Sequence, residues 1–345
     1  MNPIINFILF TSMMAGTILT ATSHHWVSAW LGLELNTLAI IPIISKTHHP
    51  RATEASTKYF LIQAATSALI LLSGITNTHL HGTWDISNLS NDLSKIMFMT
   101  ALATKLGLAP VHFWLPEILQ GVPLLTALII TTWQKIAPMA LLIATWNLIP
   151  TPITLSLGLL SATIGGLGGL NQTQLRKVMA YSSIAHLGWM TVIITINPSL
   201  TLFNLTLYIA FTSSAMLTMH LTMAKTLQNA MLTSSHSSIT TSLFSLSLLS
   251  LGGLPPLSGF SPKWLILQEL TSHHLTPLAM TMAIMALLSL MFYLRITYIS
   301  AMTLPPSTTP LKSTWRLKSN SHTLALSLFT PTSLLLLPIM PTMIQ

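Results

Sequence analysis

Long apolar stretches follow one another along almost the whole chain, and this feature constrains the fold more than any other. A helix of about 20 apolar residues crosses the core of a bilayer. The chain of 345 residues has room for about eleven such helices joined by short loops. Only 6% of its residues are charged, against roughly 25% in a soluble domain. The sequence therefore predicts an all-α polytopic membrane protein.

The predicted membrane helices leave little chain between them. The expected spans are residues 3–21, 26–45, 58–79, 95–113, 124–147, 152–170, 178–196, 200–224, 239–272 with an interruption, 276–300 and 323–343. The first span has no preceding basic residues and no convincing signal-peptide cleavage site, and it is not an Arg-rich presequence. We therefore expect it to remain in the protein.

The loop charges indicate how the chain is oriented. Basic residues gather in the loops on the side of the N-terminus, and most acidic loop residues lie on the other side. These basic residues are Lys46, Arg51, Lys58, Arg176, Lys177, Lys225, Lys312, Arg316 and Lys318. Because basic loops stay on the cytoplasmic or matrix side, we expect the N-terminus on that side.

The composition also excludes several kinds of site. The chain has no cysteine, which excludes disulfides and iron–sulfur ligation. Its net charge of +8 arises mostly in loops, where it signals topology, so nucleic acid is not an expected partner. Histidine pairs at 24–25, 48–49 and 273–274 lie near span ends and point apart, so no metal site is expected. The glycine run at 165–169 lacks the spacing of a dinucleotide fingerprint, and close helix packing explains it better.

Two segments resemble each other and suggest an internal repeat. The sequence GLAP at 107–110 recurs as GLPP at 253–256, and PE at 116–117 recurs as PK at 262–263. Each copy closes the fourth span of its half, which predicts two five-helix repeats, the second inverted relative to the first. The expected domains are a first repeat at 1–149, a second at 150–300, and a basic loop with a C-terminal membrane helix at 301–345.

The prolines in these copies predict a broken helix in each repeat. Proline removes a backbone donor and blocks the hydrogen bond to the preceding turn. Matching broken helices in two halves of a membrane protein indicate an ion path. The alternative is that the prolines only kink packed helices.

Four charged residues fall inside the predicted spans or beside their breaks: Glu34, Lys105, Lys135 and Lys263. Each charge at the centre of a bilayer costs roughly 2.5 to 3.5 kcal/mol on insertion scales. The cost of all four together is about the whole net stability of a typical domain, roughly 5 to 15 kcal/mol. Such residues are therefore expected to have a function. The alternatives are an ion pair of Glu34 with Lys105 that only fixes helix register, and a Lys263 that extends to the membrane surface.

These residues suit proton transfer. Burial disfavours the charged form of a lysine, and a nearby carboxylate favours it, so a small movement of Glu34 could make Lys105 hold or release a proton. His186, mid-span in the second half, and His112, beside the first break, are possible relays because a neutral imidazole can pass on a proton. Each is equally well explained as a histidine bonded to a neighbouring helix.

The segments quoted above, with WLGLE at 30–34 and NQTQLRKVMAYSSIAH at 171–186, closely resemble the antiporter-like membrane subunits of respiratory complex I, NADH–ubiquinone oxidoreductase. The resemblance covers the whole chain. It implies two inverted five-helix repeats with broken helices, and proton movement by a Glu–Lys pair, a central lysine and a lysine in the second broken helix. Those roles would fall on Glu34, Lys105, Lys135 and Lys263.

The resemblance also implies a setting. The protein would lie in the mitochondrial inner membrane among other membrane subunits of complex I, including neighbouring antiporter-like subunits, and phospholipid. The chain itself would hold no cofactor, since flavin, iron–sulfur clusters and quinone reduction belong to partner subunits. Bacterial relatives carry three further N-terminal helices that this chain lacks. The basic loop at 312–318 could meet a partner subunit or anionic lipid.

Two other functions remain open at this stage. One is a freestanding cation/proton antiporter that uses the same helices without an electron-transfer partner. The other is a purely structural subunit in which the buried charges stay fixed.

Overall fold

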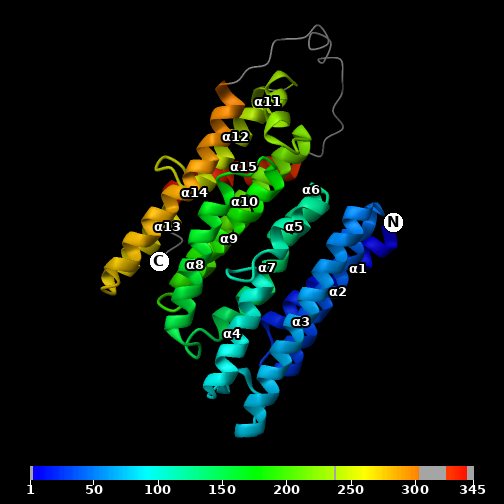
Figure 1. Ribbon diagram of the computed structural model, residues 1–345, viewed down its shortest axis with the longest axis vertical. Coiled ribbons are helices and arrows are strands. Elements are labelled where there is room, and N and C mark those ends of the chain that lie inside the picture. Colours follow the sequence, from blue (N-terminus) through cyan, green and yellow to red (C-terminus); the bar gives the residue numbers. More distant parts are fainter. Residues whose placement is uncertain (1–2, 237, 303–323, 340–345) are drawn as a thin grey trace. The chain divides into compact units, whose positions relative to one another are not determined.

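The structure, a computed structural model, describes residues 3–236, 238–302 and 324–339 (Figure 1). The described residues are mostly helical and form no strand, which confirms the predicted all-α class. Of the basic loop expected at 301–322, residues 303–322 lie outside the described residues, and so do Lys312, Arg316 and Lys318.

The helices of the first part of the chain are α1 (Pro3–Ala21), α2 (Trp26–Ile44), α3 (Pro50–His81), α4 (Asp92–Leu106), α5 (Trp114–Gly121), α6 (Leu124–Thr131) and α7 (Trp133–Ala144). Most of them fall within or near the predicted spans, but α5 lies between two of these spans and was not predicted from the sequence. α3 begins eight residues before the expected span because Pro50 suits the first turn of a helix and the His49 side chain accepts a hydrogen bond from the Arg51 amide.

The later helices also follow the predicted order. They are α8 (Thr151–Gly169), α9 (Leu175–Ile193), α10 (Pro198–Thr222), α11 (Leu227–His236), α12 (Ser238–Gly252), α13 (Phe260–Ser272), α14 (Thr276–Met302) and α15 (Leu324–Leu335). α11 was not predicted from the sequence. α15 has 12 residues, about 18 Å of helix, whereas the hydrocarbon core is about 30 Å thick.

Seven helical segments among the described residues are long and apolar enough to cross a membrane. They are Pro3–Ala21, Trp26–Thr47, Pro50–His81, Leu124–Ala144, Thr151–Gly169, Pro198–Thr222 and Thr276–Met302. The membrane class is confirmed, but the count of about eleven spans is not.

The chain divides into two compact units. The first comprises residues 1–161 and 190–201, and the second comprises 162–189 and 202–345. Within the first unit, α1 packs against α2, α2 against α3, and α3 against both α4 and α5. Figure 1 shows α1, α2 and α3 as neighbouring rods. Within the second, α12 and α13 pack against α14, and α15 packs against α12.

The same loop contact occurs inside each unit. In the first unit, His25 pairs with Asp85, so the residue before α2 meets the loop that follows α3. In the second unit, Gln174 pairs with Thr226, so the residue before α9 meets the loop that follows α10. Each unit thus ties its second helix to the end of its third.

Both predicted helix breaks are present, and each begins at a glycine rather than at a proline. α4 ends at Leu106, and Gly107 follows with φ +76°. α12 ends at Gly252, and Gly253 follows with φ +80°. This left-handed conformation is readily adopted by glycine and ends a helix. The prolines at 116 and 262 lie in the first turn of α5 and α13, where no backbone donor is lost.

A further break divides the fifth predicted span. α6 ends at Thr131 and α7 starts at Trp133, while Thr132 between them has φ −107° and ψ −69°. No glycine or proline marks this position, so the break was not predicted from the sequence. The break lies three residues before Lys135.

Candidate functional site

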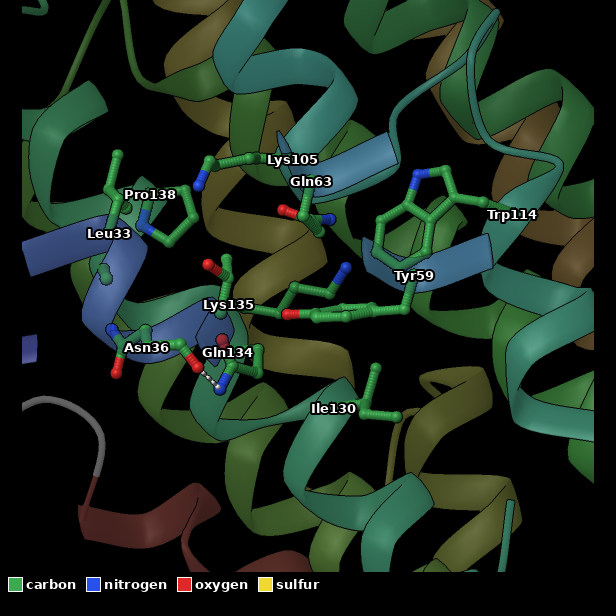
Figure 2. Close-up of a pocket in the computed structure, with 12 residues that line it drawn as sticks. Leu33, Asn36, Tyr59, Gln63, Lys105, Trp114, Ile130, Gln134, Lys135 and Pro138 are labelled. Atoms are coloured by element: carbon green, nitrogen blue, oxygen red, sulfur yellow. Dashed lines mark hydrogen bonds between the residues drawn. The ribbon is translucent and has the colours of Figure 1, made fainter. Parts of the chain in front are cut away.

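Two of the predicted lysines line one small cavity in the first unit (Figure 2). The space open to the centre of a water molecule is about 10 Å³, roughly room for one water. Its polar lining residues are Asn36, Thr37, Tyr59, Gln63, Lys105, Gln134 and Lys135. Figure 2 shows the side chains converging from α2, α3, α4 and α7. The cavity is therefore a small, partly enclosed space in which several polar side chains meet among apolar ones.

Lys135 on α7 is anchored at the first helix break. Its side chain is 1% exposed, and its Nζ donates a hydrogen bond to the carbonyl oxygen of Leu106, the last residue of α4. The break at Gly107 leaves this carbonyl without its usual partner in a continuing helix. Nζ also lies 5.3 Å from the centre of the Trp114 ring, within the range of a cation–π interaction.

Trp114 connects the elements around the cavity. It starts α5, and its indole Nε1 donates a hydrogen bond of 3.1 Å to the carbonyl oxygen of Thr104 on α4. Its ring meets the Tyr59 ring of α3 edge to face, with 6.0 Å between the ring centres. One aromatic side chain thus holds α3, α4 and α5 around the amine of Lys135.

Lys105 and Glu34 interact without touching. Lys105 is 4% exposed, and its Nζ has no hydrogen-bond partner among the described residues. The Oε2 of Glu34 is also buried there without a partner. The ion pairs of the described residues lie elsewhere, so no direct contact within 4.0 Å joins the two. Glu34 nevertheless acts electrostatically on Lys105. This arrangement differs from the tight ion pair expected if the two only fixed helix register.

Lys263 occupies the second break. It lies in the first turn of α13 with 9% of its surface exposed, and its Nζ donates a 2.7 Å hydrogen bond to the carbonyl oxygen of Gly252, the last residue of α12. The amine therefore points into its unit, toward the end of α12, rather than outward. A Cβ atom at Gly253 would lie 3.2 Å from this Nζ, so the glycine makes room for it.

The two histidines lie in different surroundings. His186 on α9 is 8% exposed, its ring centre lies 5.6 Å from that of Tyr208, and Lys263 acts on it electrostatically. His112 lies in the segment between α4 and α5, where its Nδ1 is 3.1 Å from the carbonyl oxygen of Pro110. His186 is thus grouped with Lys263, whereas His112 contacts its own loop.

The structure therefore forms one group of candidates in each unit. Lys105 and Lys135 both line the cavity and Glu34 acts electrostatically on Lys105, whereas Lys263 acts electrostatically on His186. Sequence reasoning missed Tyr59 and Trp114. Their only signal was an aromatic ring with a polar group inside or beside a predicted span. The described residues contain no group of three or more metal-ligating side chains.

The geometry defines a class of membrane protein with buried titratable groups at broken helices, and comparisons with known proteins identify the family. Residues 23–329 match the family described as NADH:quinone oxidoreductase/Mrp antiporter, TM. The chain belongs to this family.

Relatives that match from end to end carry a more particular name. The protein named NADH-ubiquinone oxidoreductase chain 2 from Varanus baritji is 81% identical over 345 residues, covering 100% of both chains. The protein of the same name from Carassius auratus is 53% identical, covering 100% of this chain and 99% of its own.

Solved structures share the fold. A chain of respiratory complex I from Thermus thermophilus gives a TM-score of 0.84 at 24% identity, covering 98% of this chain and 80% of its own. A chain of the Mrp complex from Dietzia gives a TM-score of 0.75 at 16% identity, covering 87% of this chain and 61% of its own.

Proposed function

We propose that this chain is a proton-translocating membrane subunit of respiratory NADH:ubiquinone oxidoreductase in the mitochondrial inner membrane. Full-length relatives bear the name of that enzyme's chain 2, and the family includes antiporters. The chain would carry no redox centre, and flavin and iron–sulfur clusters would belong to partner subunits. Its neighbours would be other membrane subunits and phospholipid.

The observation that carries the proposal is the pair of buried lysines at one water-sized cavity. Lys105 has no partner for its amine, and the nearby Glu34 has no partner for Oε2. Burying such groups unpaired is costly, and a structural role would be better served by direct pairing. Groups held apart near a water-sized space can instead gain and lose protons.

The mechanism requires a change of charge to pass between these groups. Redox energy released in partner subunits would alter the interaction of Glu34 with Lys105. The change would pass through Lys135 toward Lys263, with His112 and His186 as possible relays. The amines of Lys135 and Lys263 donate hydrogen bonds to the carbonyls of Leu106 and Gly252 at helix C-termini, which carry partial negative charge. Movement of a lysine away from its carbonyl would favour release of the proton.

We also propose that residues 1–149 and 150–300 form two inverted repeats, with the N-terminus on the matrix side. The glycine-ended breaks and the repeated loop contact support the repeats. Basic residues between the α-helices, including Lys46 and Lys225, support the orientation.

The test is the proton-to-electron ratio of reconstituted complex carrying Lys105→Met, with assembly checked. Lys95→Met is the matched control, because Lys95 lies on the same helix but pairs with the exposed Asp92. We expect Lys105→Met to lower the ratio or to stall NADH oxidation, and Lys95→Met to change neither.

The outcomes separate the alternatives. An unchanged ratio and rate in an assembled Lys105→Met complex would mean that the lysine is structural. Failure of the protein to migrate with NADH dehydrogenase activity on a native gel would instead favour a freestanding antiporter.

A further inference from the structure

One buried residue that lines the cavity carries a hydroxyl group without a hydrogen-bond partner among the described residues. Tyr59 on α3 is 2% exposed and lines the cavity, yet within the described residues its hydroxyl group makes no hydrogen bond. The hydroxyl of a buried tyrosine usually finds a partner. An unpaired one beside a water-sized space is therefore in a position to bind whatever enters that space.

Tyr59 lies near both kinds of titratable group in this unit. The carboxylate of Glu34 acts on it electrostatically. The Tyr59 ring and the amine of Lys135 both contact Trp114, at 6.0 Å and 5.3 Å from the centre of its ring. Figure 2 shows the Tyr59 ring and the Lys135 side chain within the same cavity.

The other polar groups of the lining are less suited to pass on a proton. The Thr37 hydroxyl donates to the backbone carbonyl of Glu34 at 2.8 Å. The amides of Asn36, Gln63 and Gln134 hold their protons too tightly to exchange them readily. A phenol oxygen can accept one proton while donating another. Among the described residues that line the cavity, Tyr59 thus has the hydroxyl group that makes no hydrogen bond.

A tyrosine recurs beside the titratable group of the other unit. Tyr208 on α10 has its ring 5.6 Å from His186 of α9. Tyr59 stands on the third helix of its unit and Tyr208 on the third helix of the second half, while Glu34 and His186 stand on the respective second helices. In both halves, therefore, a tyrosine on the third helix lies near a titratable residue on the second helix.

We infer that Tyr59 relays a proton between Lys135 and Glu34, an inference that rests on the proposed function. An N–H bond of the Lys135 ammonium breaks as a proton reaches the Tyr59 oxygen, and the original O–H bond breaks as its proton passes to the Glu34 carboxylate. Tyr59 and Lys135 both line the cavity, so the transfer from Lys135 is direct or goes through the one water that the cavity can hold. Glu34 lies outside the lining and takes up the proton on its side of Tyr59. Lys135 ends as a neutral amine, Glu34 as a carboxylic acid, and Tyr59 is unchanged.

The experiment compares Tyr59→Phe with the unchanged protein in fully assembled, reconstituted complex. Phenylalanine keeps the ring and removes only the hydroxyl, so a packing role predicts no change. We expect a lowered proton-to-electron ratio, or an NADH oxidation rate reduced several-fold, per assembled complex. Tyr298→Phe, on α14 with 63% of its surface exposed, is the matched control and should behave as the unchanged protein.

A second variant, Tyr59→His, and the Lys105→Met complex distinguish failure of the relay from failure of the proposed function. Tyr59→His restores a group that exchanges protons, so it should recover part of the activity lost in Tyr59→Phe. A Tyr59→Phe complex with unchanged ratio and rate, beside a Lys105→Met complex that is impaired, would overturn the relay and leave the proposed function standing. If neither variant is impaired, both proposals fail. A Tyr59→His complex no better than Tyr59→Phe would also overturn the relay.

Discussion

The amine of Lys263 donates a 2.7 Å hydrogen bond to the carbonyl oxygen of Gly252 at the end of α12. Lys135 makes the same kind of bond to Leu106 at the end of α4. The two carbonyls occupy matching positions immediately before the glycines of the repeated motifs, but the lysines come from different places. Lys263 lies in the continuation of its own broken helix, and Lys135 comes from the next predicted span. Each unit thus places a buried amine at the open end of a broken helix.

Gly253→Ala should displace Lys263. The new Cβ would lie 3.0 Å from Cδ and 3.2 Å from Nζ of the lysine, and the left-handed backbone adds a cost of about 1–2 kcal/mol. Gly82→Ala carries the same kind of backbone strain at φ +71° but has nothing within 4 Å of its Cβ. In assembled complex we expect proton translocation to fall for Gly253→Ala and to persist for Gly82→Ala. Equal effects would show that only the strain matters.

Trp114→Leu should impair the site more than Trp114→Phe. Leucine removes the aromatic face below Lys135, an interaction worth about 2 kcal/mol when desolvated, whereas phenylalanine keeps a ring. Both lose the hydrogen bond to Thr104. The measurements are thermal stability of the complex and its proton-to-electron ratio. Trp264→Leu, at a position 56% exposed, controls for loss of a tryptophan, and an equal ratio in the two Trp114 variants would contradict the cation–π role.

Gly16→Val should separate α1 from α2. A Cβ at Gly16 would lie 2.8 Å from the carbonyl oxygen of Gly32 and 3.0 Å from Oδ1 of Asn36. Overpacking of this kind typically costs about 1–3 kcal/mol. Ala15→Val adds the same side chain at the neighbouring exposed position. We expect assembled complex to melt at a lower temperature only for Gly16→Val, and a similar decrease for Ala15→Val would refute the role of this contact.

Lys58→Met should leave proton translocation unchanged, in contrast to Lys135→Met. Lys58 pairs with Glu54 at 2.5 Å and with Glu117 at 2.9 Å, but all three side chains are substantially exposed. Solvent screens such pairs, and the entropy lost by ordering the side chains offsets their attraction. Lys135 is 1% exposed and sits at the cavity. The proton-to-electron ratios of the two complexes check this, and a lowered ratio for Lys58→Met would place Lys58 on the proton path.

Part of the site could be predicted because charges are rare in the predicted spans. Glu34, Lys105 and Lys135 stand out in apolar surroundings, and burying a charge is costly enough that the residue type alone is informative. The breaks after Leu106 and Gly252 were predicted from the motifs that contain glycine and proline. The break at Thr132 could not be, because threonine has no strong preference against a helix that would mark it.

The apolar sequence by itself determined that the chain is a helical membrane protein with one broken helix in each half and a few charges inside its spans. The tertiary structure decided which faces of the helices turn inward. In a membrane, both faces of a helix are apolar, so hydrophobic periodicity does not distinguish them. On α14, for example, Met280 is 71% exposed and Met282 is fully buried. Packing between helices distant in sequence likewise brought Tyr59, Trp114 and Lys135 to one cavity and aimed Lys135 at the carbonyl of Leu106.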